Sequence, residues 1–262
     1  MTVSDSQLLA IDAGNSRVKL VLFKGTTFVR SEWVVNNPNS SADEWADHIG
    51  WFVRGRDGSV SSFKGSVLSS VTPHSTPAIL DALQRCELGP VLEVSASVYP
   101  HRILYDDPTQ VGADRLCDAA GGFQRAHGAV IVVDFGTAVT LNAVSEEGDF
   151  LGGVIIPGPA IASSALSVGT AQLPTVLPKF PQRVIGTDTA MNLASGLTHG
   201  WVGMVDGLVQ SMETEMGGMV SVLATGGGGV DYAKASKRIE SYYPHLTLEG
   251  AAAIFRNWKE SN

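Results

Sequence analysis

The stretch LLAIDAGNS, residues 8–16, leads into a β-rich run at residues 18–23. The pattern returns at residues 130–138 as VIVVDFGTA, which leads into a β-rich run at residues 139–144. In both copies an apolar run typical of a buried strand ends at an aspartate, and glycine and small polar residues follow before the second strand. Each copy therefore predicts a β-hairpin with an exposed polar tip.

The two predicted tips have the composition of a phosphate-binding site. Glycine lets backbone N–H groups approach an anion closely, and an aspartate can hold a divalent cation beside that anion. Two such tips facing each other would hold the phosphate chain of a Mg-nucleotide. Aspartate and glycine are also common turn residues, so a pair of plain hairpin turns is the alternative. The repetition of strand, polar tip and strand favours phosphate binding.

Bulk composition narrows the class of protein. The chain has 262 residues, 44% of them hydrophobic and 17% charged, with a net charge of -8. This acidic balance and the lack of a basic run argue against a nucleic-acid partner. No apolar segment is long enough to cross a bilayer, and residues 1–6 lack the basic region of a signal peptide. Cys86 and Cys117 have no metal-ligand spacing and indicate reduced thiols in a cytoplasmic protein.

The order of predicted elements indicates an α/β fold of two duplicated lobes, residues 1–127 and 128–262, with a cleft between them. The first half has predicted strands at 7–12, 17–23, 27–35, 64–71 and 91–95, and predicted helices at 41–54, 76–88 and 114–127. The second half has predicted strands at 129–134, 138–145, 150–157 and 220–225, and predicted helices at 159–169, 188–215, 228–236 and 248–258.

One predicted helix carries a stripe of glycines. Gly196, Gly200, Gly203 and Gly207 are spaced by four, three and four residues, which places them on one narrow face. Each glycine costs a helix about 1 kcal/mol relative to alanine, so close contact with another backbone should compensate. Tight packing inside one lobe and a helix crossing between two subunits both explain the stripe.

The segment Gly112-Ala113-Asp114-Arg115 lies where a helical pattern begins. In one interpretation Asp114 is an N-cap and Arg115 a solvated residue of the first turn. In the other, Asp114 accepts a proton from a substrate hydroxyl and Arg115 anchors an anionic substrate. Phosphoryl transfer needs mainly positioning and charge neutralisation, which two polar tips and cations could supply. No Walker A motif is present, which excludes a P-loop kinase.

Five short motifs follow one another along the chain: Asp-x-Gly-Asn-Ser at 12–16, Gly-Ala-Asp-Arg at 112–115, Asp-x-Gly-Thr-Ala-x-Thr at 134–140, Gly-Gly-x-Ile-x-Pro-Gly at 152–158 and Gly-x-Asp-Thr at 186–189. This ordered set resembles type III pantothenate kinase over essentially the whole chain. The resemblance implies an actin-like ATPase fold with two ribonuclease-H-like lobes. It also implies ATP-dependent phosphorylation of pantothenate to 4′-phosphopantothenate, the first step of coenzyme A biosynthesis, by a homodimer that uses Mg2+ and a monovalent cation, K+ or NH4+.

The resemblance also implies roles for individual residues. Asp114 would be the general base, and Asp134 would bind the monovalent cation. The first phosphate loop would comprise Asp12, Ala13, Gly14, Asn15, Ser16, Arg17, Val18 and Lys19. Thr137 would contact the ATP phosphates, and Gly226 and Gly227 would belong to a glycine-rich adenosine loop. The pantothenate site would comprise Tyr105, Gly112, Ala113, Asp114, Arg115 and Thr189, the last from its own subunit or from across the dimer.

Two residues depart from the family pattern: Val139 stands where threonine is more usual, and Lys19 is a less standard end to the first loop. Two alternatives to pantothenate kinase activity remain. Another small-molecule kinase of the superfamily would share the tips and the adenosine loop but not Gly-Ala-Asp-Arg. A non-catalytic relative of the kind described as transcriptional activators would keep the fold and work through a protein partner.

Overall fold

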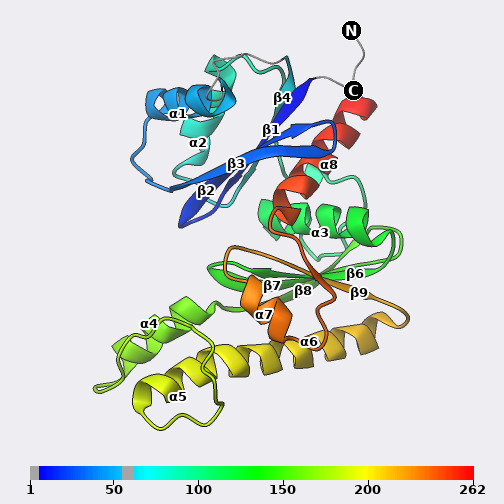
Figure 1. The fold of residues 1–262 in the computed structure, drawn as a ribbon. Coiled ribbons are helices and arrows are strands. Elements are labelled where there is room, and N and C mark those ends of the chain that lie inside the picture. The colour runs from blue at the N-terminus through cyan, green and yellow to red at the C-terminus, as the bar shows by residue number, and fades with distance from the viewer. Residues whose placement is uncertain (1–5, 55–61) are drawn as a thin grey trace. The chain divides into compact units, whose positions relative to one another are not determined.

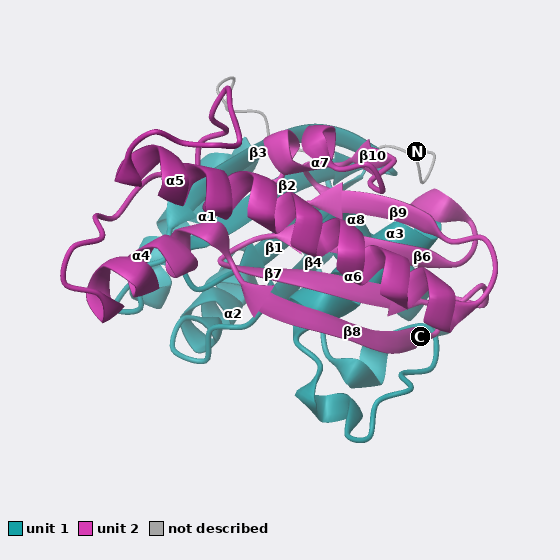
Figure 2. Ribbon diagram, turned by 90° about the horizontal axis from the view of Figure 1, so that it is seen from below, with its two compact units in different colours: residues 1–124, 246–262 teal, residues 125–245 magenta. Residues whose placement is uncertain are grey.

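The computed structural model describes residues 6–54 and 62–262 of the chain. The chain forms two compact units, residues 1–124 with 246–262 and residues 125–245 (Figures 1 and 2). Within the described residues, each helix is too short or too polar to span a bilayer. The start of the chain, for which the sequence predicts no signal peptide, falls largely at residues 1–5 and so outside the described residues.

Unit 1 is built on a five-stranded sheet with the strand order β3-β2-β1-β4-β5, in which β1 pairs antiparallel with β2 and parallel with β4. Its elements are β1 (Gln7–Ala13), β2 (Arg17–Lys24), β3 (Thr27–Val35), α1 (Ala42–Arg54), β4 (Phe63–Ser70), α2 (Thr76–Arg85), β5 (Val91–Glu93), η1 (Ala96–Val98), η2 (Pro108–Gln110), α3 (Ala113–Ala126) and α8 (Leu246–Ser261).

The alternation of side chains along β1 decides which residues are core and which reach the other face of the sheet. Leu9 and Ile11 belong to a buried cluster with residues of α1 and α2. Asp12 therefore lies on the opposite face, and α8 packs against β1 and β4 (Figure 1). The strand thus places its one carboxylate on the face away from α1 and α2.

Helices α3 and α8 meet at two glycines. A side-chain carbon on Gly121 would lie 2.5 Å from the Leu246 carbonyl oxygen, and one on Gly250 would overlap the Cys117 carbonyl. Only glycine allows the two backbones to come this close. The contact fixes α3, the helix that begins at the Gly-Ala-Asp-Arg segment.

Unit 2 repeats the design with the strand order β10-β9-β6-β7-β8, in which β6 pairs antiparallel with β7 and parallel with β9. Its elements are β6 (Val130–Phe135), β7 (Ala138–Val144), β8 (Phe150–Pro157), α4 (Pro159–Gly169), α5 (Thr189–Ser195), α6 (Trp201–Met216), β9 (Ser221–Thr225), α7 (Val230–Ala235) and β10 (Ser241–Tyr242).

The core of unit 2 lies between its sheet and helices α6 and α7 (Figure 1). Ile131, Val133 and Phe135 of β6 pack in this core with Val205 and Val209 of α6. Alternation then places Asp134 on the face of the sheet away from α6 and α7. The two units therefore present equivalent aspartates at the ends of equivalent strands.

Apart from the two short 3-10 turns η1 and η2, which were not predicted, the predicted and observed elements differ chiefly in three places. The helix expected over 188–215 is interrupted by a π-helical turn at Gly196–Gly200, between α5 and α6. The strand β10, only two residues long, was not predicted. The C-terminal helix, placed by sequence in a lobe of residues 128–262, packs in unit 1 because its buried face, including Gly250 and Phe255, meets β1, β4 and α3.

Candidate functional site

The tip between β1 and β2 is a tight turn held by backbone bonds. The Gly14 N–H donates to the Arg17 carbonyl at 3.0 Å, and the Asn36 side-chain amide donates to the Gly14 carbonyl at 2.9 Å. Asn15, Ser16 and Arg17 are exposed at the turn. The first predicted phosphate loop is therefore a rigid turn that presents polar residues to solvent, as a binding loop requires.

Asp12 stands at the base of this tip, between two neighbouring strands. In the sheet register it pairs with Lys19 of β2 and with Ser69 of β4. The Ser69 hydroxyl donates to Asp12 Oδ1 at 3.2 Å. Burial and then the charge of Asp114 raise the pKa of Asp12 to about 6, while Lys19 and Ser69 partly oppose the rise. The negative charge of Asp12 is thus disfavoured by burial and by the nearby charge of Asp114.

Asp114 lies in the first turn of α3. Its Oδ1 accepts a hydrogen bond from the Arg115 N–H at 2.8 Å, so the carboxylate satisfies one of the free N–H groups at the helix start. Burial raises the pKa of Asp114, and the Arg115 bond and charge oppose this. Gly112 is required beside it, because a side-chain carbon there would lie 2.6 Å from Asp114 Oδ1.

Arg115 is buried, with only 6% of its surface exposed. The interpretation of Arg115 as a solvated residue of the first turn is therefore wrong. A buried guanidinium is retained only where an anion compensates its charge. Asp12 interacts electrostatically with Asp114, and Asp114 with Arg115. Asp12, Asp114 and Arg115 therefore form one electrostatic group within unit 1.

The equivalent tip in unit 2 is shaped by glycine around Asp134. In the register Asp134 pairs with Thr140 of β7 and with the buried Thr225 of β9. Gly226, which follows β9, has φ of +95°, and a side-chain carbon there would overlap Asp134 Oδ1. The Tyr242 hydroxyl donates to the Gly226 carbonyl at 2.6 Å. The predicted adenosine loop thus begins beside Asp134, the predicted ligand of the monovalent cation.

The rest of the second tip is equally close-packed. The Gly158 N–H donates to the Thr137 carbonyl at 3.1 Å, and a side-chain carbon on Gly158 would overlap that carbonyl. Thr137 itself is exposed. The Pro-Gly end of the fourth motif therefore supports the turn that presents Thr137.

Two predicted substrate residues lie at exposed positions away from the tips in sequence. Tyr105 is 37% exposed in the segment before η2. Thr189 is exposed at the first position of α5, where the Asp188 side chain caps the helix by accepting from the Met191 N–H at 2.7 Å. Gly186 leaves room for this cap, since a side-chain carbon there would lie 2.5 Å from Asn192 Oδ1. The Gly-x-Asp-Thr motif is therefore a helix start that presents Thr189.

Sequence reasoning missed residues that position the tips. Ser69 holds Asp12, and Asn36 anchors the first tip while accepting from the Ser75 hydroxyl at 2.8 Å. Ser69 is one of three serines in β4, and no sequence signal separates it from Ser66 and Ser70. Asn36 gives no signal beyond its place after β3. Among the described residues there is no group of three or more metal-ligating side chains.

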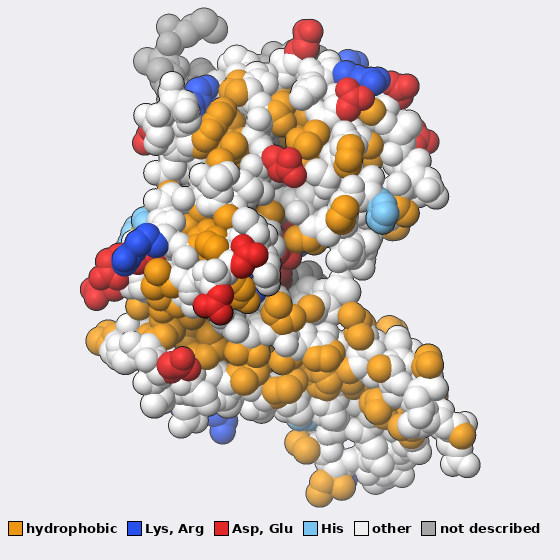
Figure 3. Space-filling view, turned by 180° about the vertical axis from the view of Figure 1, so that it is seen from behind, with side chains coloured by type: hydrophobic (Ala, Val, Ile, Leu, Met, Phe, Trp, Pro, Cys, Tyr) orange, Lys and Arg blue, Asp and Glu red, His pale blue; other side chains and the backbone are white. Residues whose placement is uncertain are grey.

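The glycine stripe faces open space. A side-chain carbon on Gly196, Gly200, Gly203 or Gly207 would meet no other described atom within 4 Å. Packing inside the lobe therefore does not explain the stripe among the described residues. Figure 3 shows hydrophobic side chains on one face of the molecule. The exposed apolar side chains of unit 2 include Ile155, Ile161, Val184, Ile185 and Met204.

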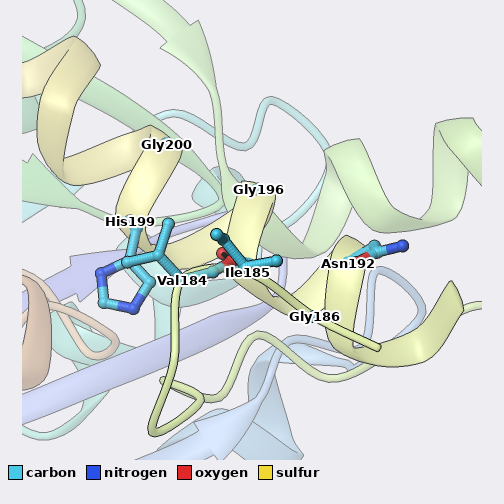
Figure 4. Close-up of a pocket in the computed structure, with 8 residues that line it drawn as sticks. Val184, Ile185, Gly186, Asn192, Gly196, His199 and Gly200 are labelled. Carbon is cyan, nitrogen blue, oxygen red and sulfur yellow. Dashed lines mark hydrogen bonds between the residues drawn. The ribbon is translucent and has the colours of Figure 1, made fainter. Parts of the chain in front are cut away.

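A pocket of about 450 Å³ opens beside the start of this stripe (Figure 4). The Val184–Gly186 segment lies over the helix there, and His199 and Asn192 stand at its two ends. Its lining residues are Val184, Ile185, Gly186, Asn192, Ser195, Gly196, His199 and Gly200.

Two units with equivalent five-stranded sheets and equivalent polar tips define the α/β architecture of actin-like ATPases and sugar kinases. Solved structures show the same fold. A structure described as a Baf family transcriptional activator, from Campylobacter jejuni, has a TM-score of 0.57 at 18% identity over 96% of this chain and 99% of that chain. An inorganic polyphosphate/ATP-glucomannokinase from Arthrobacter has a TM-score of 0.50 at 13% identity over 98% of this chain and 100% of that chain.

Sequence comparison identifies the family within this class. The family model of type III pantothenate kinase matches residues 8–211, and the chain belongs to this family. A type III pantothenate kinase from Myxococcus xanthus is 37% identical over 254 residues, which is 95% of this chain and 97% of that protein. The chain is therefore a kinase, and its likeness to the Campylobacter structure is a likeness of fold.

Proposed function

We propose that this kinase transfers the γ-phosphoryl group of ATP to the primary hydroxyl of pantothenate and forms 4′-phosphopantothenate, the first step of coenzyme A biosynthesis. Family membership supports the substrate. The observation that carries the proposal is the electrostatic group of Asp12, Asp114 and Arg115 in unit 1. It combines a site for a cation–phosphate pair, a base and a buried cationic group, which phosphoryl transfer to a hydroxyl of an anionic substrate requires.

In this proposal Asp114 is the general base of an in-line transfer. Its carboxylate is largely buried but is aligned by the Arg115 N–H, so it can accept a hydroxyl proton without rotating. Burial raises its pKa, which makes it a better proton acceptor than an exposed aspartate. Arg115 would hold the pantothenate carboxylate, and Gly112, Ala113, Tyr105 and Thr189 would complete the substrate site.

The residues present fit the proposed ATP and Mg2+. Kinases hold Mg2+ through one or two carboxylates together with phosphate oxygens, so a cluster of three acidic residues is not needed. Burial and then the charge of Asp114 raise the pKa of Asp12, and a bound cation would offset both effects. Bound Mg2+ would neutralise the phosphate charge. The loop from Asp12 to Lys19, with Thr137, Gly226 and Gly227, would contact the nucleotide.

Asp134 is the proposed ligand of a monovalent cation, K+ or NH4+. The absence of a side chain at Gly226 leaves room beside its Oδ1, and Thr140 and Thr225 place oxygen atoms at the paired positions of the neighbouring strands. A carboxylate with neutral oxygens around it is the kind of ligand set that alkali cations take. The cation would supply positive charge near the phosphates.

We also propose that the working form is a homodimer and that the glycine stripe, which runs from the π-helical turn into α6, lies in its interface. Glycines on one helix face cost stability unless another backbone approaches closely. A side-chain carbon on any of these glycines would meet no atom of the described residues beyond its own stretch of helix, and the exposed Val184 and Ile185 line a pocket with Gly196 and Gly200. The free cysteines, Cys86 and the buried Cys117, support a cytoplasmic location, where thiols stay reduced.

The decisive experiment measures ADP release with Mg-ATP and pantothenate in K+ and in Na+, for the wild type and Asp114→Asn. We expect K+ to support turnover far better than Na+, and the variant to lose about 100- to 10,000-fold in kcat. Its free energy of unfolding should not fall, because the replaced carboxylate is disfavoured by burial.

Three results would contradict the proposal. Equal rates for the wild type and Asp114→Asn would remove Asp114 from its role. ADP release that does not depend on pantothenate would indicate another acceptor. No turnover with any acceptor, from a protein that still binds Mg-ATP, would favour a non-catalytic relative.

A further inference from the structure

Ser69 is a fully buried hydroxyl residue on β4 that the proposed function does not use. The parallel register of β1 and β4 pairs it directly with Asp12. Its hydroxyl donates to Asp12 Oδ1 at 3.2 Å. A buried hydroxyl is costly unless it is hydrogen-bonded, and this bond satisfies the hydroxyl of Ser69.

A second side chain, from α3, lies beside Ser69. It is the fully buried Cys117 thiol, one turn along the helix from Asp114. Burial raises the pKa of the Cys117 thiol well above its usual range, so the thiol keeps its proton. The Ser69 hydroxyl, between this thiol and β1, donates its single proton to Asp12 Oδ1. The serine therefore links the strand that carries Asp12 to the helix that carries Asp114.

We propose that Ser69 is a positioning residue for phosphoryl transfer, and that it fixes the Asp12 carboxylate in the orientation that receives Mg-ATP. The inference rests on the proposed role of Asp12. Asp12 and Asp114 repel each other, so a carboxylate without a fixed donor would turn away from its neighbour. The neutral Ser69 donor holds one Asp12 oxygen and leaves the other for the cation that accompanies the phosphates.

The chain contains a matched control on the same strand. Ser66 is also fully buried, but it pairs with Leu9 and so lies on the face of the sheet that packs against α1 and α2. Its hydroxyl has no hydrogen-bond partner among the described residues. Removal of the two hydroxyls therefore creates similar small cavities, whereas only one of them touches Asp12.

The experiment compares Ser69→Ala with Ser66→Ala in the full-length protein. The measurements are Mg-ATP affinity by calorimetry without pantothenate, kcat and KM for both substrates, and the thermal unfolding midpoint. We expect Ser69→Ala to weaken Mg-ATP affinity roughly tenfold or more, since it removes a hydrogen bond to a charged group. The KM for pantothenate should stay within about twofold of the wild type, and Ser66→Ala should leave every constant within about twofold.

Ser69→Cys keeps the volume of the site with a weaker donor and provides a second variant if alanine unfolds the protein. It should give an intermediate loss of Mg-ATP affinity. The inference is overturned if Ser69→Ala or Ser69→Cys behaves like Ser66→Ala, or if KM for both substrates rises in parallel with lost stability, as a merely structural role predicts. Because the calorimetry needs no pantothenate, a wrong acceptor would contradict the proposed function and leave this test intact.

Discussion

Asp12 and Asp134 hold equivalent places in the two units: each ends a central strand, and each faces away from the main helical core of its sheet. Their surroundings differ. Asp12 is flanked by Lys19 and Ser69 and feels the charge of Asp114, whereas the paired positions beside Asp134 are both threonines. One fold repeated twice thus supplies a scaffold, and the residues on neighbouring strands give each copy a different chemistry.

Helical glycines also have different surroundings in the two units. In unit 1, Gly121 and Gly250 let α3 and α8 touch and so fix the helix that carries Asp114. In unit 2, a side-chain carbon on any glycine of the stripe would meet no atom within 4 Å among the described residues outside its own stretch of helix. These helical glycines therefore close an internal contact in unit 1, whereas those of the stripe leave a face open in unit 2.

The largest expected effect comes from adding a side chain at the contact between α3 and α8. In Gly250→Ala the new methyl group would overlap the Cys117 carbonyl, and backbone cannot move aside as a side chain can. We expect the free energy of unfolding to fall by about 3 kcal/mol or more. Equilibrium unfolding in urea measures this free energy.

Gly50→Ala in α1 is the control, since its new carbon would meet only the end of the Arg54 side chain, at 3.8 Å. Alanine is the better helix former, so this variant should gain up to about 1 kcal/mol. A Gly250→Ala protein as stable as the wild type would show that α3 and α8 are not fixed by this contact.

The second prediction concerns the stability cost of Asp12. Its pKa is raised in the folded protein, so its contribution to stability is fully present below the unfolded pKa and is lost as pH rises through the folded value of about 6. A rise from 3.8 to about 6 corresponds to roughly 3 kcal/mol. Asp12→Asn should therefore be more stable than the wild type at pH 8, by up to that amount, with the difference vanishing near pH 4. Urea unfolding across this range measures the difference.

Asp107→Asn provides a control of opposite sign. Hydrogen bonds from Thr109 and Gln110 lower the pKa of the exposed Asp107, so its stabilising contribution is present above the unfolded pKa and is lost as pH falls through the folded one. This variant should be slightly less stable than the wild type at neutral pH. A pH-independent difference for Asp12→Asn would contradict the electrostatic account of the first tip.

The third prediction tests the glycine beside Asp134. Gly226→Ala would force a side chain into a backbone with φ of +95° and against the Asp134 carboxylate. We expect kcat/KM for Mg-ATP to fall about 100-fold, the scale of a displaced charged ligand group. Gly128→Ala, where the new carbon meets no described atom within 4 Å, should keep the wild-type value. Equal kinetics in the two variants would remove this tip from nucleotide binding.

The sequence predicted the two sheets well because apolar runs and repeated polar tips are local signals. It placed Asp12 and Asp134 at strand ends for the same reason. It could not assign α8 to unit 1, because an amphipathic pattern shows that a helix buries one face and not which sheet covers it. The two residues of β10 are too few to show alternation, and the π-helical turn at Gly196–Gly200 leaves the helical pattern nearly unchanged.

The sequence analysis named the charged residues of the candidate site but not the residues that position them. Asp114 and Arg115 follow a motif, but the burial of Arg115 depends on packing that no local pattern encodes. Ser69 comes 57 residues after Asp12, and only the parallel pairing of β1 with β4 brings them together. Residues that orient a site from another strand are visible only once the strands are paired.

The smallest expected effect tests the open face of unit 2. Gly203→Arg would place a charged side chain where a carbon atom meets nothing among the described residues, so the subunit fold should tolerate it. In a homodimer joined through this face, the same charge would be buried without a partner. We expect the dimer dissociation constant to rise about tenfold or more, with the subunit's secondary structure retained. Sedimentation over a range of concentrations, with circular dichroism as the check on folding, measures both. Lys234→Ala on α7 is the control, and a Gly203→Arg variant that dimerises as tightly as the wild type would show that the glycines serve some purpose other than subunit contact.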